Sequence, residues 1–245
     1  AFPIELVAVI NGGGVISDTF SHLAFDKIIF TGSTRIGKTI MAAASENLVP
    51  VILELGGKSP VLVHPSIDLE DVAQRLAAGK LWNAGQTCVA PDYVFLPKGK
   101  TAAFIEHYRL CVQEMYPDLA YNQDYTSIIN DQQYNRLQGY LEDAVIQGAE
   151  VIALNPNNED LTGVRKIAPT VLTGVTPNMK IMQEEIFGPI LPILEYDQID
   201  DVIDFIEDME EEGSIDSDES RLLYSAFEFG DVSVLDILTD RRDIV

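Results

Sequence analysis

The sequence predicts an α/β protein, and three observations carry that prediction. Short apolar runs alternate with longer amphipathic stretches up to about residue 196. Strands that alternate with helices of this length are typical of a largely parallel sheet covered by helices. Apolar residues make up 47% of the 245 residues, enough for a sizeable core, and none of the apolar runs approaches the about 18 residues of a membrane span.

The predicted strands follow the apolar runs in chain order. They are Leu6–Ile10, Lys27–Phe30, Val51–Leu55, Val61–Val63, Tyr93–Leu96, Val151–Leu154 and Ala168–Leu172. The predicted helices lie between them and cover Gly37–Asn47, Leu69–Ala84, Thr101–Met115 and Asp131–Gln147. Asp68 is a candidate N-cap of the second helix, because a short acidic side chain there can accept from a free backbone N–H group.

The net charge of −23 is unevenly distributed along the chain. Residues 197–245 contain 17 acidic and 3 basic residues, so this fifth of the chain carries −14 of the total. The change in composition predicts a boundary near residue 200, followed by an acidic, mainly helical tail. The acidity also argues against a nucleic-acid surface, which needs clustered Lys and Arg.

The cysteine and histidine content excludes two further classes of site. Two cysteines, Cys88 and Cys111, have no metal-ligand spacing, which argues for a reducing compartment and against a disulfide framework. The three histidines are scattered, so the sequence predicts no metal centre. We expect a cytoplasmic protein.

Cys88 is the candidate nucleophile and Glu54 the candidate base. A thiol attacks as its thiolate, and an ordinary Cys with a pKa of about 8.5 needs help to ionise near neutral pH. Glu54 lies 34 residues upstream of Cys88, so the two side chains can meet only through the fold. The alternative is an inert, structural cysteine, which is the commoner role of a lone Cys.

A second hypothesis comes from a match to the phosphate-loop pattern G-x-x-x-x-G-K-[ST]. The matching run is Gly32-Ser33-Thr34-Arg35-Ile36-Gly37-Lys38-Thr39, between a predicted strand and a predicted helix. In a nucleotide hydrolase, Lys38 and Thr39 would serve the phosphates and magnesium. Against this, no apolar strand ending in a Walker-B Asp follows at a suitable distance, and Glu54 and Cys88 are left without a role.

Four segments, in their order and spacing, resemble the aldehyde dehydrogenase superfamily. They are Phe30-Thr31-Gly32-Ser33-Thr34 with Gly37, Leu53–Pro60, Gly85–Cys88, and Glu184-Glu185-Ile186-Phe187-Gly188-Pro189. The run Val89-Ala90-Pro91-Asp92-Tyr93 after the cysteine is most similar to the fatty-aldehyde and coniferyl-aldehyde branch. The resemblance covers about residues 1–196.

The resemblance implies NAD- or NADP-dependent oxidation of an aldehyde, aromatic or long-chain, to a carboxylic acid. Cys88 would form a thiohemiacetal and then a thioester, and its backbone N–H would be one oxyanion donor. Glu54 would activate the hydrolytic water. The cofactor-binding residues that the resemblance implies are Gly32, Ser33, Gly37, Leu55, Glu185 and Phe187. Glu185 would bond the ribose beside the nicotinamide, and Phe187 would pack near that ring. Without the resemblance, they would be taken for a solvated acid and a core aromatic.

The resemblance also implies a domain organisation. Residues 1–55 would end a Rossmann-like NAD(P)-binding domain, and residues 56–196 would form the α/β catalytic domain. The family's catalytic unit includes an earlier half with an Asn oxyanion donor, so we expect little turnover from this chain alone. Family members are usually homo-oligomers.

Residues 205–245 resemble a different family, which would make the chain chimeric. Glu219-Ser220-Arg221 and the run Phe227–Val234 are similar to the connector that precedes paired CBS domains in hemolysin-like magnesium and cobalt efflux proteins. The alternative is an acidic tail without a function of its own. A third hypothesis for the whole chain is therefore a non-catalytic interaction module.

Overall fold

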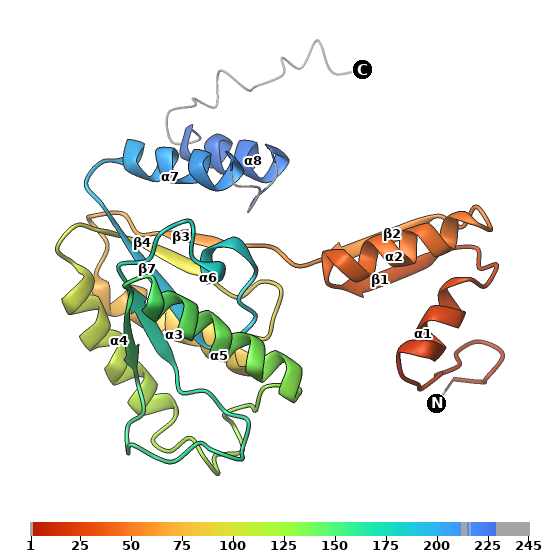
Figure 1. Cartoon of the computed structure of the whole chain (residues 1–245), viewed down its shortest axis with the longest axis horizontal. Coiled ribbons are helices and arrows are strands. Elements are labelled where there is room, and N and C mark those ends of the chain that lie inside the picture. Colours follow the sequence, from red (N-terminus) through yellow and green to blue (C-terminus); the bar gives the residue numbers. More distant parts are fainter. Residues whose placement is uncertain (1, 212–214, 216, 229–245) are drawn as a thin grey trace. The chain divides into compact units, whose positions relative to one another are not determined.

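The computed structural model describes residues 2–211, 215 and 217–228, and the chain divides into two compact units, residues 1–57 and 58–245 (Figure 1). Unit 1 contains α1 (Gly14–Ser21), β1 (Ile28–Gly32), α2 (Thr34–Ser45) and β2 (Val51–Leu55). Unit 2 contains β3 (Pro60–Leu62), α3 (Leu69–Leu81), the short η1 (Trp82–Gly85), β4 (Tyr93–Pro97), α4 (Thr101–Met115), α5 (Asp131–Ile146), β5 (Glu150–Ala153), β6 (Thr170–Thr173), α6 (Lys180–Gln183), β7 (Ile190–Tyr196), α7 (Ile199–Glu211) and α8 (Ser217–Glu228).

Unit 1 contains a β–α–β element in which β1 and β2 are parallel and α2 connects them. The register pairs Thr31 with Glu54 and Gly32 with Leu55, so both strands end at the same edge. Gly37 lets α2 lie close to β2, because a Cβ atom there would lie 2.8 Å from Leu55 Cδ2.

Unit 2 is built on a five-stranded sheet with the order β3-β4-β7-β6-β5. Its strands are parallel except β5, which runs antiparallel to β6 at one edge. The α/β prediction with a largely parallel sheet is thus confirmed, and the sheet is mixed only because of β5. The assignment of units 1 and 2 to a cofactor-binding and a catalytic domain stays a prediction.

Both faces of the unit 2 sheet are covered. Val94 and Leu96 of β4 pack with α3 and α4 in one apolar cluster, whereas Tyr93 and Phe95 pack with α5, α6 and α7 in the other. Successive side chains of a strand point to opposite faces, so a central strand between two helical layers must be apolar throughout. Among the described residues, no helix combines the length and the apolar character needed to cross a bilayer.

Several elements differ from the sequence prediction, among them the helices α1 and α6, which were not predicted. Leu6–Ile10 is not a strand; it pairs with no strand in the described part of the chain and its side chains are exposed. The first predicted helix begins three residues earlier than expected, at Thr34, because Ser33 acts as its N-cap. The strand β7 was not predicted, and it contains Pro192. Proline is unusual inside a central strand, and here the pairing with β4 begins only at Ile193.

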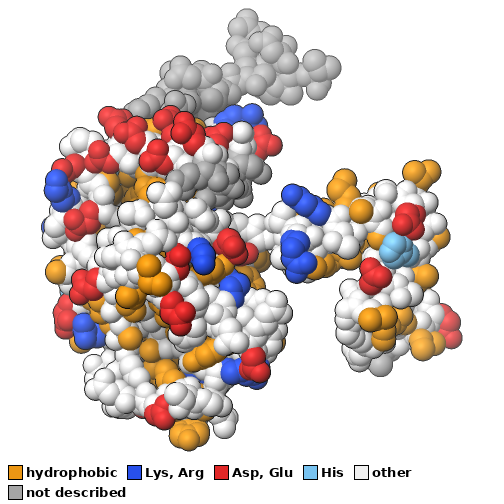
Figure 2. All heavy atoms as spheres, in the orientation of Figure 1, with side chains coloured by type: hydrophobic (Ala, Val, Ile, Leu, Met, Phe, Trp, Pro, Cys, Tyr) orange, Lys and Arg blue, Asp and Glu red, His pale blue; other side chains and the backbone are white. Residues whose placement is uncertain are grey.

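The first part of the acidic segment is helical and packs on the sheet. Val202, Ile206 and Met209 of α7 are fully buried in the second apolar cluster, at the spacing of one helix face. The opposite face carries the acidic side chains that gather over α7 in Figure 2: Asp200, Asp201, Asp204, Glu207, Asp208 and Glu211. Residues 229–245, which include most of the run Phe227–Val234 that carries the predicted CBS-connector similarity, lie outside the described residues.

Candidate active site

Cys88 lies in a tight turn that follows α3, and its side chain is exposed. Three consecutive residues before it have left-handed backbones, with φ values of 52° at Asn83, 52° at Ala84 and 73° at Gly85. Non-glycine residues adopt this conformation rarely, and a run of them reverses the chain sharply. The reversal ends the helix and presents the thiol at the surface of unit 2.

The side chain of Gln86 fixes this cysteine loop to a neighbouring segment. Its Nε2 donates to the Asn83 carbonyl oxygen and to the Ser127 carbonyl oxygen, each at 3.1 Å. Its Oε1 accepts from the Ile129 N–H group at 2.9 Å. The loop is therefore held by hydrogen bonds to residues more than 40 positions away, and its conformation does not depend on local turn chemistry alone.

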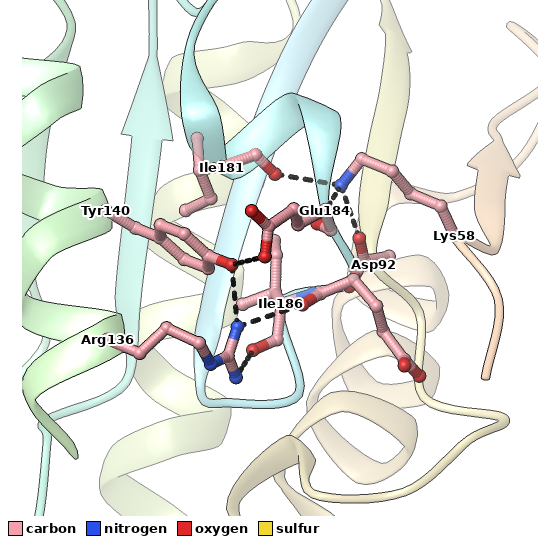
Figure 3. Close-up of polar contacts among 8 residues, drawn as sticks. Lys58, Asp92, Arg136, Tyr140, Ile181, Glu184 and Ile186 are labelled. Atoms are coloured by element: carbon pink, nitrogen blue, oxygen red, sulfur yellow. Dashed lines mark hydrogen bonds and ion pairs between the residues drawn. The ribbon is translucent and has the colours of Figure 1, made fainter. Parts of the chain in front are cut away.

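The segment 184–188, between α6 and β7, is anchored on one side by a buried ion pair. Lys58 Nζ lies 2.5 Å from Asp92 Oδ2, and both side chains are 4% exposed. The same ammonium group donates to the carbonyl oxygens of Ile181 at 2.8 Å and Glu184 at 3.0 Å. Asp92 Oδ1 accepts from the Ile186 N–H group at 3.0 Å, so both members of the ion pair form hydrogen bonds with this segment (Figure 3).

Two side chains of α5 hold the same segment from the opposite side (Figure 3). The Arg136 guanidinium donates to the carbonyl oxygens of Glu185 at 3.1 Å and Ile186 at 2.7 Å. Tyr140 donates its hydroxyl proton to Glu184 Oε2 at 2.7 Å and accepts from Arg136 at 2.9 Å. Burial and the bond to Glu184 raise the pKa of Tyr140 to about 12, so the hydroxyl stays protonated at neutral pH.

The segment also touches the cysteine loop directly. A Cβ atom at Gly85 would lie 2.2 Å from the Gly188 carbonyl oxygen, so two backbones meet where no side chain fits. The structure therefore brings Cys88's loop next to the segment that carries Glu185 and Phe187. Phe187 has a left-handed backbone with φ 51° and is 36% exposed. Glu185 is half-buried.

Lys80 lies fully buried beneath this region, near the end of α3. It is 1% exposed, and its Nζ has no hydrogen-bond partner within the described residues. Burial lowers the pKa of Lys80 to about 8, with opposing effects from the Asp92 carboxylate, which raises it, and the Lys58 ammonium, which lowers it. The Glu185 carboxylate also raises the pKa of Lys80, because a negative charge favours the ammonium form.

The remaining predicted residues lie in unit 1, at the edge where β1 and β2 end. Gly32 and Ser33 connect β1 to α2, while Glu54 and Leu55 end β2 beside them. Glu54 is exposed. Because Glu54 belongs to unit 1 and Cys88 to unit 2, their meeting stays a prediction.

The phosphate-loop hypothesis does not fit this geometry. In a P-loop, several residues between strand and helix form a loop whose N–H groups surround the phosphates. Here α2 begins at Thr34, directly after its N-cap Ser33, so Gly37 and Lys38 already lie within the helix. Thr39 donates its hydroxyl to the Arg35 carbonyl oxygen at 3.3 Å, as a residue inside a helix does. The segment is a helix start and contains no phosphate-binding loop.

Comparison with known proteins gives the family. A sequence profile described as "Aldehyde dehydrogenase family" matches residues 1–219. The chain belongs to the aldehyde dehydrogenase family. The match confirms the resemblance seen in the sequence and extends past residue 196 into the acidic segment. The similarity to CBS-domain efflux proteins stays a prediction.

Individual relatives agree with the family match. A protein of Pseudomonas aeruginosa named probable coniferyl aldehyde dehydrogenase is 47% identical over 205 residues, covering 84% of this chain and 42% of that protein. A substrate-bound AldH of Staphylococcus aureus has a TM-score of 0.75 at 41% identity, over 84% of this chain and 44% of the other. The betaine aldehyde dehydrogenase of S. aureus in complex with NAD+ has a TM-score of 0.70 at 27% identity. The match covers 80% of this chain and 40% of that protein. This chain thus spans less than half the length of these relatives.

Sequence reasoning missed the residues that support the site. Lys58 and Asp92 lie 34 positions apart in the sequence, a separation that gives no sign that they pair. Arg136 and Tyr140 are four residues apart on one helix, a spacing that shows only that they share a face. Within the described residues, no group of three or more His, Cys, Asp or Glu side chains is arranged to hold a metal ion.

Proposed function

We propose that this chain carries the cysteine part of an NAD(P)-dependent aldehyde dehydrogenase, which oxidises an aldehyde to a carboxylic acid. The observation that carries the proposal is the exposed Cys88 thiol on an anchored loop, in a chain of the aldehyde dehydrogenase family. The loop lies against the segment that contains Glu185 and Phe187, the two residues proposed to orient the cofactor.

The proposed chemistry uses Cys88 as a nucleophile. Its sulfur attacks the aldehyde carbon, forming a C–S bond and an alkoxide that the Cys88 backbone N–H stabilises. When the carbonyl re-forms, the carbon loses a hydride and a thioester remains on Cys88. A bound nicotinamide supplies the acceptor for that hydride. Glu54 then takes a proton from water, whose oxygen attacks the thioester, and the C–S bond breaks to release the acid and the thiol.

The residues of unit 1 fit a dinucleotide. The first N–H groups of a helix have no partner inside the helix, and they favour an anion at its N-terminus. Ser33, the N-cap, brings the chain from β1 into α2 directly after Gly32. Gly37 keeps α2 close to β2, which places the helix end beside Glu54 and Leu55. Gly32, Ser33, Gly37 and Leu55 are thus proposed to hold the pyrophosphate side of the cofactor.

The proposed substrate is an aromatic or long-chain aldehyde. Two large apolar side chains close to the cysteine in the chain are exposed: Trp82 is 68% and Val89 72% exposed. Such side chains suit an apolar substrate group better than a polar one. The names of relatives at 47–50% identity, coniferyl aldehyde dehydrogenases, support the aromatic choice.

An activated ester tests the nucleophile and the base without any cofactor. 4-Nitrophenyl acetate can acetylate Cys88 directly, producing the same thioester class that aldehyde oxidation would produce. We expect the intact chain to gain one acetyl group, which peptide mapping places on Cys88. In Glu54→Gln the acetyl group should persist longer, because the hydrolytic water has lost its base.

Cys111 provides the matched control, since it is the other cysteine and its thiol is partly buried. Burial raises the pKa of Cys111, which lowers its reactivity. Cys111→Ala should therefore acetylate like the parent, and Cys88→Ala should not. If Cys88→Ala is acetylated as fast as the parent, the nucleophile assignment is wrong. If Glu54→Gln deacetylates at the parent rate, the base assignment is wrong.

A further inference from the structure

The left-handed backbone of Phe187 is the feature from which the inference starts. A bulky residue with φ 51° is a strained exception, and it persists only where the surroundings enforce it. Phe187 is also 36% exposed, so full burial in the core does not account for its conformation. Such strain at a partly exposed aromatic indicates a functional constraint on where the ring points.

The enforcing contacts converge on Ile186, the residue before Phe187. The Ile186 N–H group donates to Asp92 Oδ1 at 3.0 Å, and its carbonyl oxygen accepts from Arg136 at 2.7 Å. Its side chain is fully buried. Both peptide groups of Ile186 are therefore fixed, one by an ion-paired carboxylate and the other by a guanidinium.

Arg136 fixes two successive carbonyl groups with one rigid side chain. It also donates to the Glu185 carbonyl oxygen at 3.1 Å, so the peptide planes on either side of Ile186 are held by the same planar fork. The guanidinium is itself held, since its Nε donates to Gln133 Oε1 at 2.6 Å and its Nη1 donates to the Tyr140 hydroxyl at 2.9 Å. Its geometry is thus set by α5, a rigid element.

We infer that Arg136 is a positioning residue which, with Tyr140 and Asp92, locks the backbone of residues 184–187 and thereby aims Glu185 and Phe187 at the nicotinamide end of the cofactor. This inference rests on the proposed function for the identity of the ligand. The locking itself concerns only this chain's own backbone, and it can be tested without any ligand.

Hydrogen exchange tests the locking. In Arg136→Gln, the amides of residues 184–188 should exchange roughly tenfold faster than in the parent, because two carbonyl anchors are lost. Arg136→Lys should restore little of the slow exchange, since a lysine ammonium lacks the planar fork that donates to both carbonyl oxygens. The matched control is Arg75→Gln on α3, an exposed Arg paired with Asp71, which should leave exchange at these amides unchanged.

A double substitution separates positioning from general support. If Arg136 enforces the left-handed backbone of Phe187, its removal should matter much less when residue 187 prefers that conformation by itself. In the Phe187→Gly background, Arg136→Gln should therefore accelerate exchange by about twofold or less. An equal acceleration in both backgrounds means that Arg136 only stabilises the fold, and overturns the inference.

Binding tests the ligand. Equilibrium titration of the 245-residue chain should show that Arg136→Gln weakens NAD+ or NADP+ by about tenfold and leaves ADP-ribose, which lacks the nicotinamide ring, unaffected. If Arg136→Gln weakens the binding of the dinucleotide and of ADP-ribose equally, the proposal that this segment is directed at the nicotinamide is wrong. If the parent chain binds neither NAD+ nor NADP+, the proposed function is wrong, and so is the proposed orientation of Glu185 and Phe187 toward the nicotinamide. The hydrogen-exchange experiments then decide by themselves whether Arg136 locks the segment.

Discussion

Lys58 and Asp92 form a buried ion pair in which Nζ and Oδ2 lie 2.5 Å apart. The pair joins the first residue of unit 2 to the end of the loop that carries Cys88, and it also binds the segment 184–186. One carboxylate therefore connects Lys58 with the segment that carries Glu185 and Phe187.

Removing one partner of this pair should be costly. In Asp92→Asn, the Lys58 ammonium remains buried without a counter-charge, and we expect the free energy of unfolding to fall by about 3 kcal/mol or more. Urea denaturation measures the change. Asp71→Asn, in the exposed pair with Arg75, should change stability by about 0.5 kcal/mol or less. Equal small effects at both sites would contradict the structural role of Lys58 and Asp92.

Lys80 should make stability rise with pH. Its pKa is about 8 in the folded chain and about 10.5 in the unfolded chain, so between these values the unfolded state binds more protons. The cost of burying the charge is full below about pH 8 and is relieved as pH rises toward 10.5. Lys80→Met removes the cost at every pH.

The measurement for Lys80 is the difference in unfolding free energy between Lys80→Met and the parent. We expect this difference to shrink by about 2–3 kcal/mol between about pH 7 and about pH 10. The control is Lys98→Met, whose exposed ammonium pairs with Asp197 and whose pKa is raised by that bond. A difference for Lys80→Met that stays constant with pH would mean that Lys80 titrates normally.

Gly85 should tolerate no side chain. Its φ of 73° disfavours other residues, and an added Cβ would collide with the Gly188 carbonyl oxygen at 2.2 Å. We expect Gly85→Ala to lower the free energy of unfolding by about 3 kcal/mol or more. Gly139→Ala makes the same chemical change on α5 with nothing within 4 Å of the new Cβ, and should stabilise by about 0.5–1 kcal/mol. A stable Gly85→Ala variant would show that the two backbones can separate.

The helical conformation of residues 34–39 predicts that ATP does not bind there. We expect acylation of the exposed Lys38 by an amine-reactive reagent to proceed at the same rate with and without Mg-ATP. Peptide mass spectrometry measures the rate, and exposed Lys98 serves as the internal reference. Strong, selective protection of Lys38 by Mg-ATP would revive the phosphate-loop hypothesis.

The sequence determined the elements whose signals are local. Thr101–Met115 was predicted with the bounds that the structure has, and Val51–Leu55 likewise, because apolar periodicity and turn residues define such elements. The family also follows from the sequence, since its motifs and their order are visible without a structure. Leu6–Ile10 failed because a strand needs a neighbour to pair with, and an apolar run cannot show that one is present.

Only the tertiary structure decided which polar residues support the site. Arg136 reaches the Ile186 carbonyl oxygen across 50 positions of sequence, and Asp92 reaches the Ile186 N–H group across 94. A hydrogen bond needs donor and acceptor within about 3 Å, a condition that the folding of the whole sheet sets and that no local pattern records. The sequence by itself determined the family and the presence of Cys88 as a candidate nucleophile, whereas the packing of α5 and the Lys58–Asp92 pair decides how the segment beside that cysteine is held.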